Sequence, residues 1–289
     1  MLVNRVPIRQ STLRLWMDCR EKYRLSEVEG IRAVEPNVHY HFGSVVHKIA
    51  ESYWAGKPFM DAFHAALALS LEIDLRLVTA NNRKKYEDLV KYISPITRLY
   101  YERHMEEWKD DPAVYNEHKF VADYGVHEGI EIVSTGTIDR LQQSGTLSDL
   151  KTAAAIGTDW KSQLKKRLLR EPQLPFYRRY AEHDGHAVST IEYEVLVKPY
   201  RGSDPFFETI DVTDEFMKQQ KTWEQQADWA IREIAEFHAH CLDVAPWPQS
   251  TSACTSMIWG ECEYLPICLG RSSAQNSALY QIESKGANL

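Results

Sequence analysis

The sequence predicts an α/β fold, because segments with a helical spacing of apolar residues alternate with short β-branched segments. The pattern is helical near the start of the chain, changes to strands in the middle, and then alternates helix with strand. The expected helices cover residues 11–24, 42–54, 59–108 (as two helices), 157–170, 172 onward and 213–241. The expected strands cover residues 114–121, 130–134, 137–142, 146–151, 187–200 and 205–212.

Composition indicates an ordinary globular protein. The 289 residues are 44% hydrophobic and 26% charged, which suits one large domain or two small ones. The net charge of −7 argues against a protein coated in nucleic acid, although it leaves room for a local basic groove. No apolar run approaches the roughly 18 residues of a membrane span, and the first residues lack the apolar core of a signal peptide. We therefore expect a cytoplasmic protein with reduced cysteines.

The helix expected over residues 42–54 carries a histidine, His47, on its apolar side. A lone histidine in such a position is more often a hydrogen-bonded core residue than a metal ligand. Glu51 follows four residues later on the same face and could orient the imidazole ring. Residues 59–108 then continue as helical packing, and Pro95 is expected to kink or interrupt the second of these helices.

The hairpin expected over residues 137–151 carries the clearest chemistry. Asp139 lies on its first strand, while Asp149 and Lys151 lie two residues apart on the second and so point to one face. Carboxylates are the hard oxygen ligands that Mg²⁺ or Mn²⁺ prefers, and a lysine beside them can hold a phosphate or position a water. A hairpin with surface salt bridges explains these residues about equally well. Glu117, on the preceding strand, either supports such a site or is simply exposed.

A basic segment follows the hairpin. Its charged residues are Lys161, Lys165, Lys166, Arg167 and Arg170. Such a run is usually a solvated helix face, and the alternative is contact with a nucleic-acid backbone. On the next expected helix, Gln173 and Tyr177 are neighbours four residues apart.

The irregular segment after residue 242 is rich in cysteine. Three cysteines fall within 15 residues, with gaps of seven and five residues between them: Cys254, Cys262 and Cys268. In a reducing compartment this grouping indicates a metal site. Cys19 could supply a fourth ligand, and four thiolates suit zinc or an iron–sulfur cluster. Cys241 is expected to be a buried free thiol, and residues 271–289 are expected to form a polar tail that can be disordered.

Taken together, these segments resemble the RecB-like nucleases of the PD-(D/E)xK superfamily over most of the chain. The stretch STLRLWMDCREKYRL resembles the family's opening helix, and GSVVHKIAE resembles its histidine motif. GTIDRL resembles the motif of the first aspartate, SDLKT the acid-x-lysine pair, and QLPFY the later glutamine–tyrosine motif. The closing cysteines resemble the iron–sulfur branch, shared with CRISPR-adaptation exonucleases and AddAB-type nucleases. That branch more often shows C-x2-C-x5-C, whereas the first gap here is seven residues.

The resemblance implies a restriction-endonuclease-like core with a small mixed sheet. It implies one nuclease domain over residues 1–270, with a helical insertion at about 57–111 and a polar tail at 271–289. The implied ligands of Mg²⁺ or Mn²⁺ are His47, Asp139, Asp149 and the backbone carbonyl of Leu150. Lys151 would orient the attacking water, and Gln173 and Tyr177 would contact DNA or brace the site. The implied ligands of a 4Fe–4S cluster, with zinc as the alternative metal, are Cys19, Cys254, Cys262 and Cys268.

The activity implied by this resemblance is metal-dependent DNA hydrolysis, with an exonuclease on single-stranded ends as the specific expectation. The basic segment would follow the backbone, and Tyr53, Trp54 and Tyr177 are candidates to stack on bases in a channel covered by the helical insertion. Two alternatives stay open: a DNA-binding or assembly module with weak cleavage, and an endonuclease specific for a structure, a sequence or an RNA-directed target. The expected partners are DNA and a separate helicase or recombination protein, with no membrane partner.

Overall fold

The computed structural model describes residues 4–105, 107–154, 159–171, 173–198, 203–244, 246–250, 254–256, 260–276 and 278–283. Contacts divide the chain into two compact units. The central unit consists of Pro36–Phe120 and Gly136–Lys221, and the terminal unit consists of Met1–Glu35, Val121–Thr135 and Thr222–Leu289. Three long elements run through both: β3 (Ala113–His127), β4 (Ile130–Gln142) and α10 (Thr213–His240). This division does not test the single domain expected over residues 1–270, which stays a prediction.

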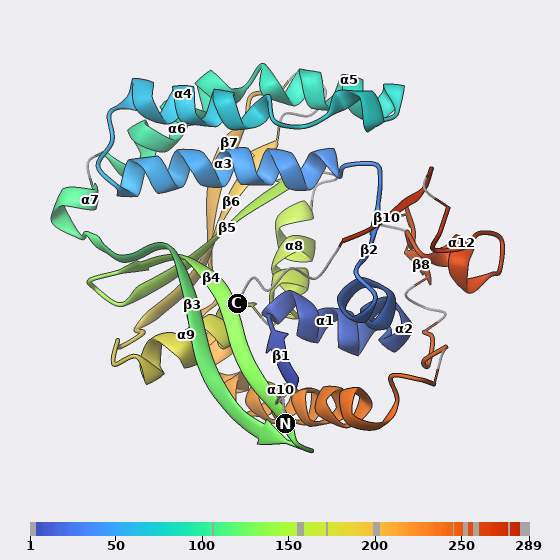
Figure 1. Ribbon diagram of the computed structural model, residues 1–289. Helices are drawn as coiled ribbons and strands as arrows, with labels where there is room; N and C mark the ends of the chain where they lie inside the picture. Colours follow the sequence, from blue (N-terminus) through green and yellow to red (C-terminus); the bar gives the residue numbers. More distant parts are fainter. Residues whose placement is uncertain are drawn as a thin grey trace. The chain divides into compact units, whose positions relative to one another are not determined.

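The sheet of the central unit is mixed, as the sequence predicted. Its strands are the second half of β4, β5 (Thr146–Ala154), β6 (Thr190–Lys198) and β7 (Phe206–Asp211) (Figure 1). The β4–β5 and β6–β7 pairs are antiparallel, whereas β5 and β6 are parallel. A parallel pair needs a long crossover connection, and two helices supply it, α8 (Trp160–Leu168) and α9 (Gln173–His183).

The turn between β4 and β5 depends on a glycine. Gly145 has φ +90°, and a Cβ there would lie 2.7 Å from the carbonyl oxygen of Ala187. A side chain is therefore excluded both by conformation and by space. The β4–β5 ladder pairs Leu141 with Leu147 and Arg140 with Ser148. The turn and this register bring the residues just beyond the ladder, Asp139 and Asp149, toward each other.

Helix α3 (Val38–Trp54) packs one side into the core of the central unit. Phe42, Val45, Val46 and Ile49 are buried at helical spacing. The helix begins four residues before the expected start, because the side chain of Asn37 accepts hydrogen bonds from the first free backbone N–H groups. The buried stripe fixes the rotation of α3 and leaves its other side for polar residues.

The predicted insertion consists of further helices that pack against α3. They are α4 (Phe59–Ser70), a 3₁₀ turn at Leu75–Leu77, α5 (Ala80–Val90), α6 (Ile93–His104) and α7 (Glu107–Asp110). Figure 1 shows α4, α5 and α6 beside α3 in the central unit. Pro95 does not interrupt a helix as predicted. It lies in the first turn of α6, where the missing N–H would have no intrahelical partner.

The terminal unit begins with β1 (Asn4–Ile8), which pairs in parallel with the first half of β4. The single helix expected over residues 11–24 is instead two helices, α1 (Gln10–Asp18) and α2 (Arg20–Tyr23), followed by a π-helical turn at Arg24–Val28. The break falls at Cys19, whose backbone is extended. Trp16 fills the core beneath, in edge-on contact with Phe237 of α10 and Trp247.

Part of the segment expected as a polar tail forms regular structure. Residues 280–282 form β10, which pairs antiparallel with β2 (Ile31–Ala33). Tyr264 and Tyr280 pack with Leu25 and Ile31 in a small apolar cluster, which explains why this polar segment is held. The short elements β8 (Thr255–Ser256), β9 (Gly260–Glu261) and α12 (Leu265–Cys268) precede it. Pro172 and residues 284–289 lie outside the described residues.

Candidate active site

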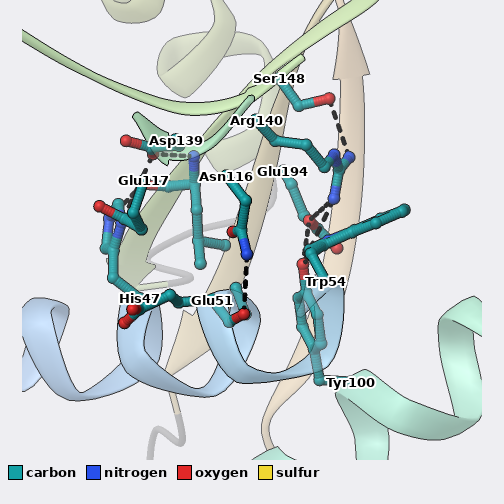
Figure 2. Close-up of a pocket in the computed structure, with 12 residues that line it drawn as sticks. His47, Glu51, Trp54, Tyr100, Asn116, Glu117, Asp139, Arg140, Ser148 and Glu194 are labelled. Atoms are coloured by element: carbon teal, nitrogen blue, oxygen red, sulfur yellow. Dashed lines mark hydrogen bonds and ion pairs between the residues drawn. The ribbon is translucent and has the colours of Figure 1, made fainter. Parts of the chain in front are cut away.

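His47 of α3 lies against two carboxylates and one backbone carbonyl (Figure 2). Its Nδ1 is 2.9 Å from Glu117 Oε1 and 3.5 Å from Asp139 Oδ2, and its Nε2 is 3.0 Å from the Leu150 carbonyl oxygen. All these partners are acceptors, so both ring nitrogens donate when no metal is bound, and a metal ligated by the ring would take the place of one proton. Burial lowers the pKa of His47, but the charges of Asp139 and Glu117 outweigh it and raise the pKa to about 9.

Glu117 is the site residue whose role the sequence left open. It lies within strand β3, yet its φ is +47°. A non-glycine residue in the left-handed region costs roughly 1–2 kcal/mol, and such strain is concentrated at functional sites. The unusual backbone accompanies the contact of its carboxylate with His47. No sequence signal marks a positive φ at a glutamate, so sequence reasoning could not have decided between its two roles.

Asp139 joins the histidine to the second strand of the hairpin. Its Oδ2 accepts a hydrogen bond of 2.8 Å from the backbone N–H of Leu150. The carbonyl oxygen of Leu150 contacts His47. The backbone N–H and C=O of Leu150 therefore both have a partner in the site. Burial raises the pKa of Asp139, while the nearby charges of His47 and Lys151 act in the opposite direction.

Asp149 and Lys151 form a buried ion pair that continues onto α9. Asp149 Oδ2 lies 2.5 Å from Lys151 Nζ, and Nζ donates to Gln173 Oε1 at 2.6 Å. Gln173 Nε2 in turn donates to the Tyr177 hydroxyl at 3.2 Å. Of the two roles expected for Gln173 and Tyr177, the geometry favours bracing, because Gln173 accepts from the lysine and Tyr177 accepts from Gln173.

The carboxylate of Asp149 is completely buried, and its Oδ1 has no hydrogen-bond donor among the described residues. Burial raises its pKa, the adjacent Lys151 lowers it, and the nearby Asp139 raises it further, for a net increase. A buried carboxylate with an uncompensated oxygen is costly unless it is paired or coordinates a metal. This orphaned oxygen fits a divalent cation as the missing partner.

The residues present also supply a suitable donor set. One atom each of His47, Glu117 and Asp139 lie within 4.8 Å of one another, and within the described ranges they form the one such group of three. Oxygen ligands suit Mg²⁺ or Mn²⁺, and an imidazole nitrogen adds to the fit for Mn²⁺. The structure therefore brings three of the four expected ligands together, namely His47, Asp139 and the Leu150 carbonyl. Asp149 lies outside the compact set, and Glu117 joins it instead.

A cavity of about 380 Å³ opens on this cluster. Its lining residues come from α3, β3, β4, α4 and α9: Ser44, His47, Lys48, Glu51, Leu69, Glu117, Thr137, Asp139 and Tyr177. Leu69 belongs to α4, so one helix of the segment expected to be an insertion forms part of the cavity wall.

Two of the three aromatic residues expected to stack on bases do not line this cavity. Tyr53 and Trp54 are 2% and 7% exposed and belong to the core around α3. Trp54 Nε1 donates to the Tyr100 hydroxyl, and its ring lies 4.5 Å from the guanidinium carbon of Arg140. The expectation was wrong because the apolar stripe of α3 turns both rings into the core. Tyr177 lines the cavity.

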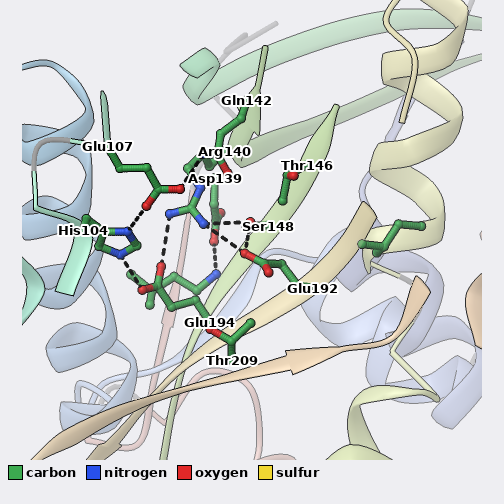
Figure 3. A network of polar contacts seen from close by, with 12 residues as sticks. His104, Glu107, Asp139, Arg140, Gln142, Thr146, Ser148, Glu192, Glu194 and Thr209 are labelled. Atoms are coloured by element: carbon green, nitrogen blue, oxygen red, sulfur yellow. Dashed lines mark hydrogen bonds and ion pairs between the residues drawn. The ribbon is translucent and has the colours of Figure 1, made fainter. Parts of the chain in front are cut away.

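A second cluster of buried charges, the Arg140 network, lies beside the site (Figure 3). Arg140 Nη1 donates to Glu194 at 3.2 Å, and Nη2 donates to Glu192 at 3.2 Å and to Ser148 Oγ at 2.8 Å. His104 bridges Glu194 and Glu107 with contacts of 2.8 and 2.7 Å. No local sequence pattern indicates this network, because its members come from well-separated segments.

The basic segment is only partly available for a ligand. Lys161 pairs with Glu208, and Lys165 Nζ lies 2.8 Å from Glu215. Lys166 and Arg170 are exposed and form no ion pair with any residue in the described ranges. Arg167 is half-buried and has a polar partner. The segment is therefore neither a uniform solvated face nor a uniform cationic surface.

The four cysteines expected at a cluster lie near one another in the terminal unit. Burial raises the pKa of Cys268 to about 11, with further contributions from Glu21, Cys262, Cys19 and Cys254. The Cys262 backbone N–H donates to the Cys254 carbonyl at 3.0 Å. Cys241, which follows α10, is half-buried rather than fully buried as expected. The grouping is present, although no three of these sulfurs form a set within 4.8 Å in the described part of the chain.

The mixed sheet and the acidic cluster at its hairpin define an α/β protein with a candidate divalent-metal site. The sequence model of the PD-(D/E)XK nuclease superfamily matches residues 8–269. The chain therefore belongs to the PD-(D/E)XK nuclease superfamily, and its restriction-endonuclease-like α/β fold is confirmed.

Among solved structures, the chain is similar to a protein from Eubacterium rectale provisionally described as an exonuclease. The two are 15% identical with a TM-score of 0.48, and the match covers 85% of each chain. The family assignment does not rest on this likeness. No curated protein sequence matches the chain significantly. None of the helices in the described ranges is both long and apolar enough to cross a membrane.

Proposed function

We propose that this chain hydrolyses DNA phosphodiester bonds with Mg²⁺ or Mn²⁺ bound at His47, Asp139 and Asp149. The observation that carries the proposal is the buried Asp149–Lys151 pair, with one carboxylate oxygen unsatisfied, beside Asp139 and the Leu150 peptide. Membership of a nuclease superfamily supports the reaction class. The sequence pattern supports the same assignment independently of the contacts.

A divalent cation held here would polarise the phosphoryl group and make a bound water acidic. Glu117 extends the donor set beyond the expected residues and fixes the ring of His47. The Leu150 carbonyl faces the same space, because Asp139 holds the N–H of that residue.

Lys151 would hold the attacking water or a phosphate oxygen. Its ammonium group has three donor hydrogens, and the contacts with Asp149 and Gln173 use two of them. Burial lowers the pKa of Lys151, but Asp149 and Asp139 outweigh it and raise the pKa above its ordinary value. The lysine therefore stays a cation and acts by position and charge.

The proposal is tested with purified Asp149→Asn and Lys151→Ala proteins on labelled DNA with Mn²⁺. We expect each to lose cleavage by about 10² or more, the loss that follows removal of one strong electrostatic stabiliser. Asp88→Asn is the control, because Asp88 is paired on the surface with Lys91. Cleavage near the unmodified rate by either site variant would reject the assignment.

The specific activity we propose is exonucleolytic cleavage of single-stranded DNA ends. The position of α4 supports it, because Leu69 of this helix contributes to the wall of the cavity beside the cluster. Linear and covalently closed circular single strands of equal sequence distinguish the alternatives. The linear strand should be degraded progressively while the circle survives. Equal cleavage of both would indicate an endonuclease, and tight binding with negligible cleavage would indicate a binding module.

We also propose that Cys19, Cys254, Cys262 and Cys268 bind a 4Fe–4S cluster in the terminal unit. Their mutual proximity and the extended backbone at Cys19 support it. Protein purified without oxygen should be brown, with iron and sulfide in comparable amounts. A colourless protein with one zinc would replace the iron assignment.

We propose further that the unpaired part of the basic segment contacts the DNA backbone. Lys166→Gln and Arg170→Gln should each reduce the salt dependence of binding by about one phosphate contact. Lys165→Gln is the matched comparison, and it should have less effect because Glu215 already holds Lys165. Equal effects from all three variants would show that the ion pair with Glu215 does not keep Lys165 from contacting DNA.

A further inference from the structure

One side of α3 forms a polar wall of the cavity. Ser44, His47, Lys48 and Glu51 recur at spacings of three and four residues, which places them on one helical face. Asn116 of β3 fixes the helix at this point, because its Nδ2 donates to the backbone carbonyl of Glu51 at 2.9 Å (Figure 2). The wall is therefore held in a defined position relative to Glu117 and Asp139.

The cavity lining has more negative than positive side chains, which repels an anionic ligand. The cavity lining includes the carboxylates of Glu51, Glu117 and Asp139. Among the residues that line it, Lys48 is the one lysine or arginine. The proposed metal at His47 and Asp139 would meet the phosphate that reacts, so a neighbouring phosphate of the strand would need a further cation, and Lys48 is the candidate in the lining.

Lys48 is placed to exchange its present partner for a phosphate. Its Nζ lies 2.7 Å from Glu51 Oε2, three residues along the helix. The two side chains are 34% and 38% exposed. A partly solvated pair of this kind contributes little to stability, so breaking it costs little. Glu51 holds the ammonium group at the cavity wall without binding it tightly.

We propose that Lys48 binds a phosphate of the nucleic-acid strand within this cavity, next to the phosphate that is cleaved. The proposal rests on the proposed nuclease function and adds a substrate contact to it. Lys48 leaves Glu51 when the strand enters, and its charge offsets the acidic wall. Lys151 acts at the reacting phosphate, whereas Lys48 holds the strand.

The test compares two lysines with the same local pairing. Lys91 also forms an ion pair three residues apart, with Asp88 at 2.6 Å, but it follows the last residue of α5, is exposed and does not line the cavity. All variants carry Asp149→Asn, so that the oligonucleotide is bound but not cleaved. The second substitution is Lys48→Gln, Lys48→Arg or Lys91→Gln. Affinity for a fluorescent single-stranded oligonucleotide is measured over a range of KCl concentrations.

We expect Lys48→Gln to reduce the salt slope of binding by about 0.7, the value for one phosphate contact on a single strand. Lys48→Arg should keep the slope, and Lys91→Gln should leave it unchanged. An unchanged slope for Lys48→Gln overturns the inference, and equal losses for Lys48→Gln and Lys91→Gln do so as well. Cleavage by the otherwise unmodified chain is assayed in parallel. If that chain cleaves DNA while the Lys48→Gln slope is unchanged, the inference fails and the nuclease function stands. If it neither binds nor cleaves, both fail.

Discussion

Two clusters of buried charge lie side by side in the central unit, and neighbouring residues of β4 and β5 supply both. Asp139 and Asp149 serve the candidate site, while Arg140 and Ser148 serve the Arg140 network. Figure 2 shows Asp139 beside Glu117, and Ser148 beside Arg140. In the network, both terminal nitrogens of the guanidinium have acceptors, and Nε alone has none among the described residues. In the site, the buried Asp149 keeps an unsatisfied oxygen. The Arg140 network therefore contributes stability, whereas the candidate site keeps an oxygen that can bind a ligand.

The largest effect should come from breaking the network. Arg140→Leu leaves Glu192 and Glu194 without their central cation, and removing one partner from a buried charge cluster costs about 3–5 kcal/mol of unfolding free energy. Chemical denaturation measures this loss. Arg76→Leu is the control, because its pair with Asp74 is exposed and screened by solvent and should contribute little to stability. Similar stabilities for the two variants would contradict the comparison.

A smaller effect is expected from a change at Glu117, because its carboxylate orients His47, one of the proposed metal ligands. Glu117→Gln keeps the shape but removes the charge that faces His47. Loss of such support typically costs 10- to 100-fold in metal affinity or activity. Titration of Mn²⁺ followed by its electron paramagnetic resonance signal measures the affinity directly. Glu131→Gln, on β4 and paired with Arg5, is the control. Unchanged Mn²⁺ affinity would remove Glu117 from the site.

The two clusters should respond to acid in opposite ways. Burial raises the pKa of Glu194, but His104 and Arg140 outweigh it and lower the pKa to about 2. Because this is below its ordinary value of 4.5, Glu194 contributes stability above pH 4.5 that is lost as the pH falls toward 2. Asp139 and Asp149 have raised pKa values, so their contribution weakens as the pH rises instead.

Thermal unfolding between pH 5 and 3 tests this contrast. Glu194→Gln should flatten the fall of Tm with acid, while Glu72→Gln, an exposed residue, should follow the unmodified protein. Parallel curves for both variants would show that Glu194 does not carry the acid sensitivity.

The smallest expected effect is a change in unfolding free energy caused by removing the steric strain of a positive φ angle. Glu128 has φ +50° in a turn, much like Glu117 in the site at +47°. Glu128→Gly should raise the unfolding free energy by about 1 kcal/mol, because glycine adopts this conformation without the steric cost. Denaturant midpoints measure the gain, and Asp123→Gly, at a non-glycine position outside the positive-φ set, should give none. A loss of stability in Glu128→Gly would mean that the side chain outweighs the strain.

The hairpin at the site could be predicted because its rules are local. A two-residue spacing puts Asp149 and Lys151 on one face, and a Ser–Gly turn fixes the return of the chain. The four-residue spacing of Gln173 and Tyr177 likewise anticipated their contact. The α/β order followed from the same periodicities, and the fold class was confirmed.

What could not be predicted depends on contacts between distant segments or on unusual backbone angles. The Arg140 network joins residues more than 50 positions apart in the sequence, as with Glu194. The break at Cys19 interrupts a segment whose apolar spacing continues smoothly, so periodicity alone conceals it. Tyr53 illustrates the same limit, since a ring on a helix could face a ligand or the core, and only the packing of α3 decides.

The pairing of β2 with β10 has a consequence for how the protein is made. Ile31 pairs with Ile282, so one strand leaves the ribosome long before its partner. Contacts of such long sequence separation form late, because closing a long loop costs entropy before the contact repays it. During synthesis, β2 therefore waits as an unpaired edge until residue 282 has emerged, and a chaperone that shields exposed strands would act at that stage. Ribosome-bound chains stalled before and after residue 282 should differ in protease resistance around residues 31–33.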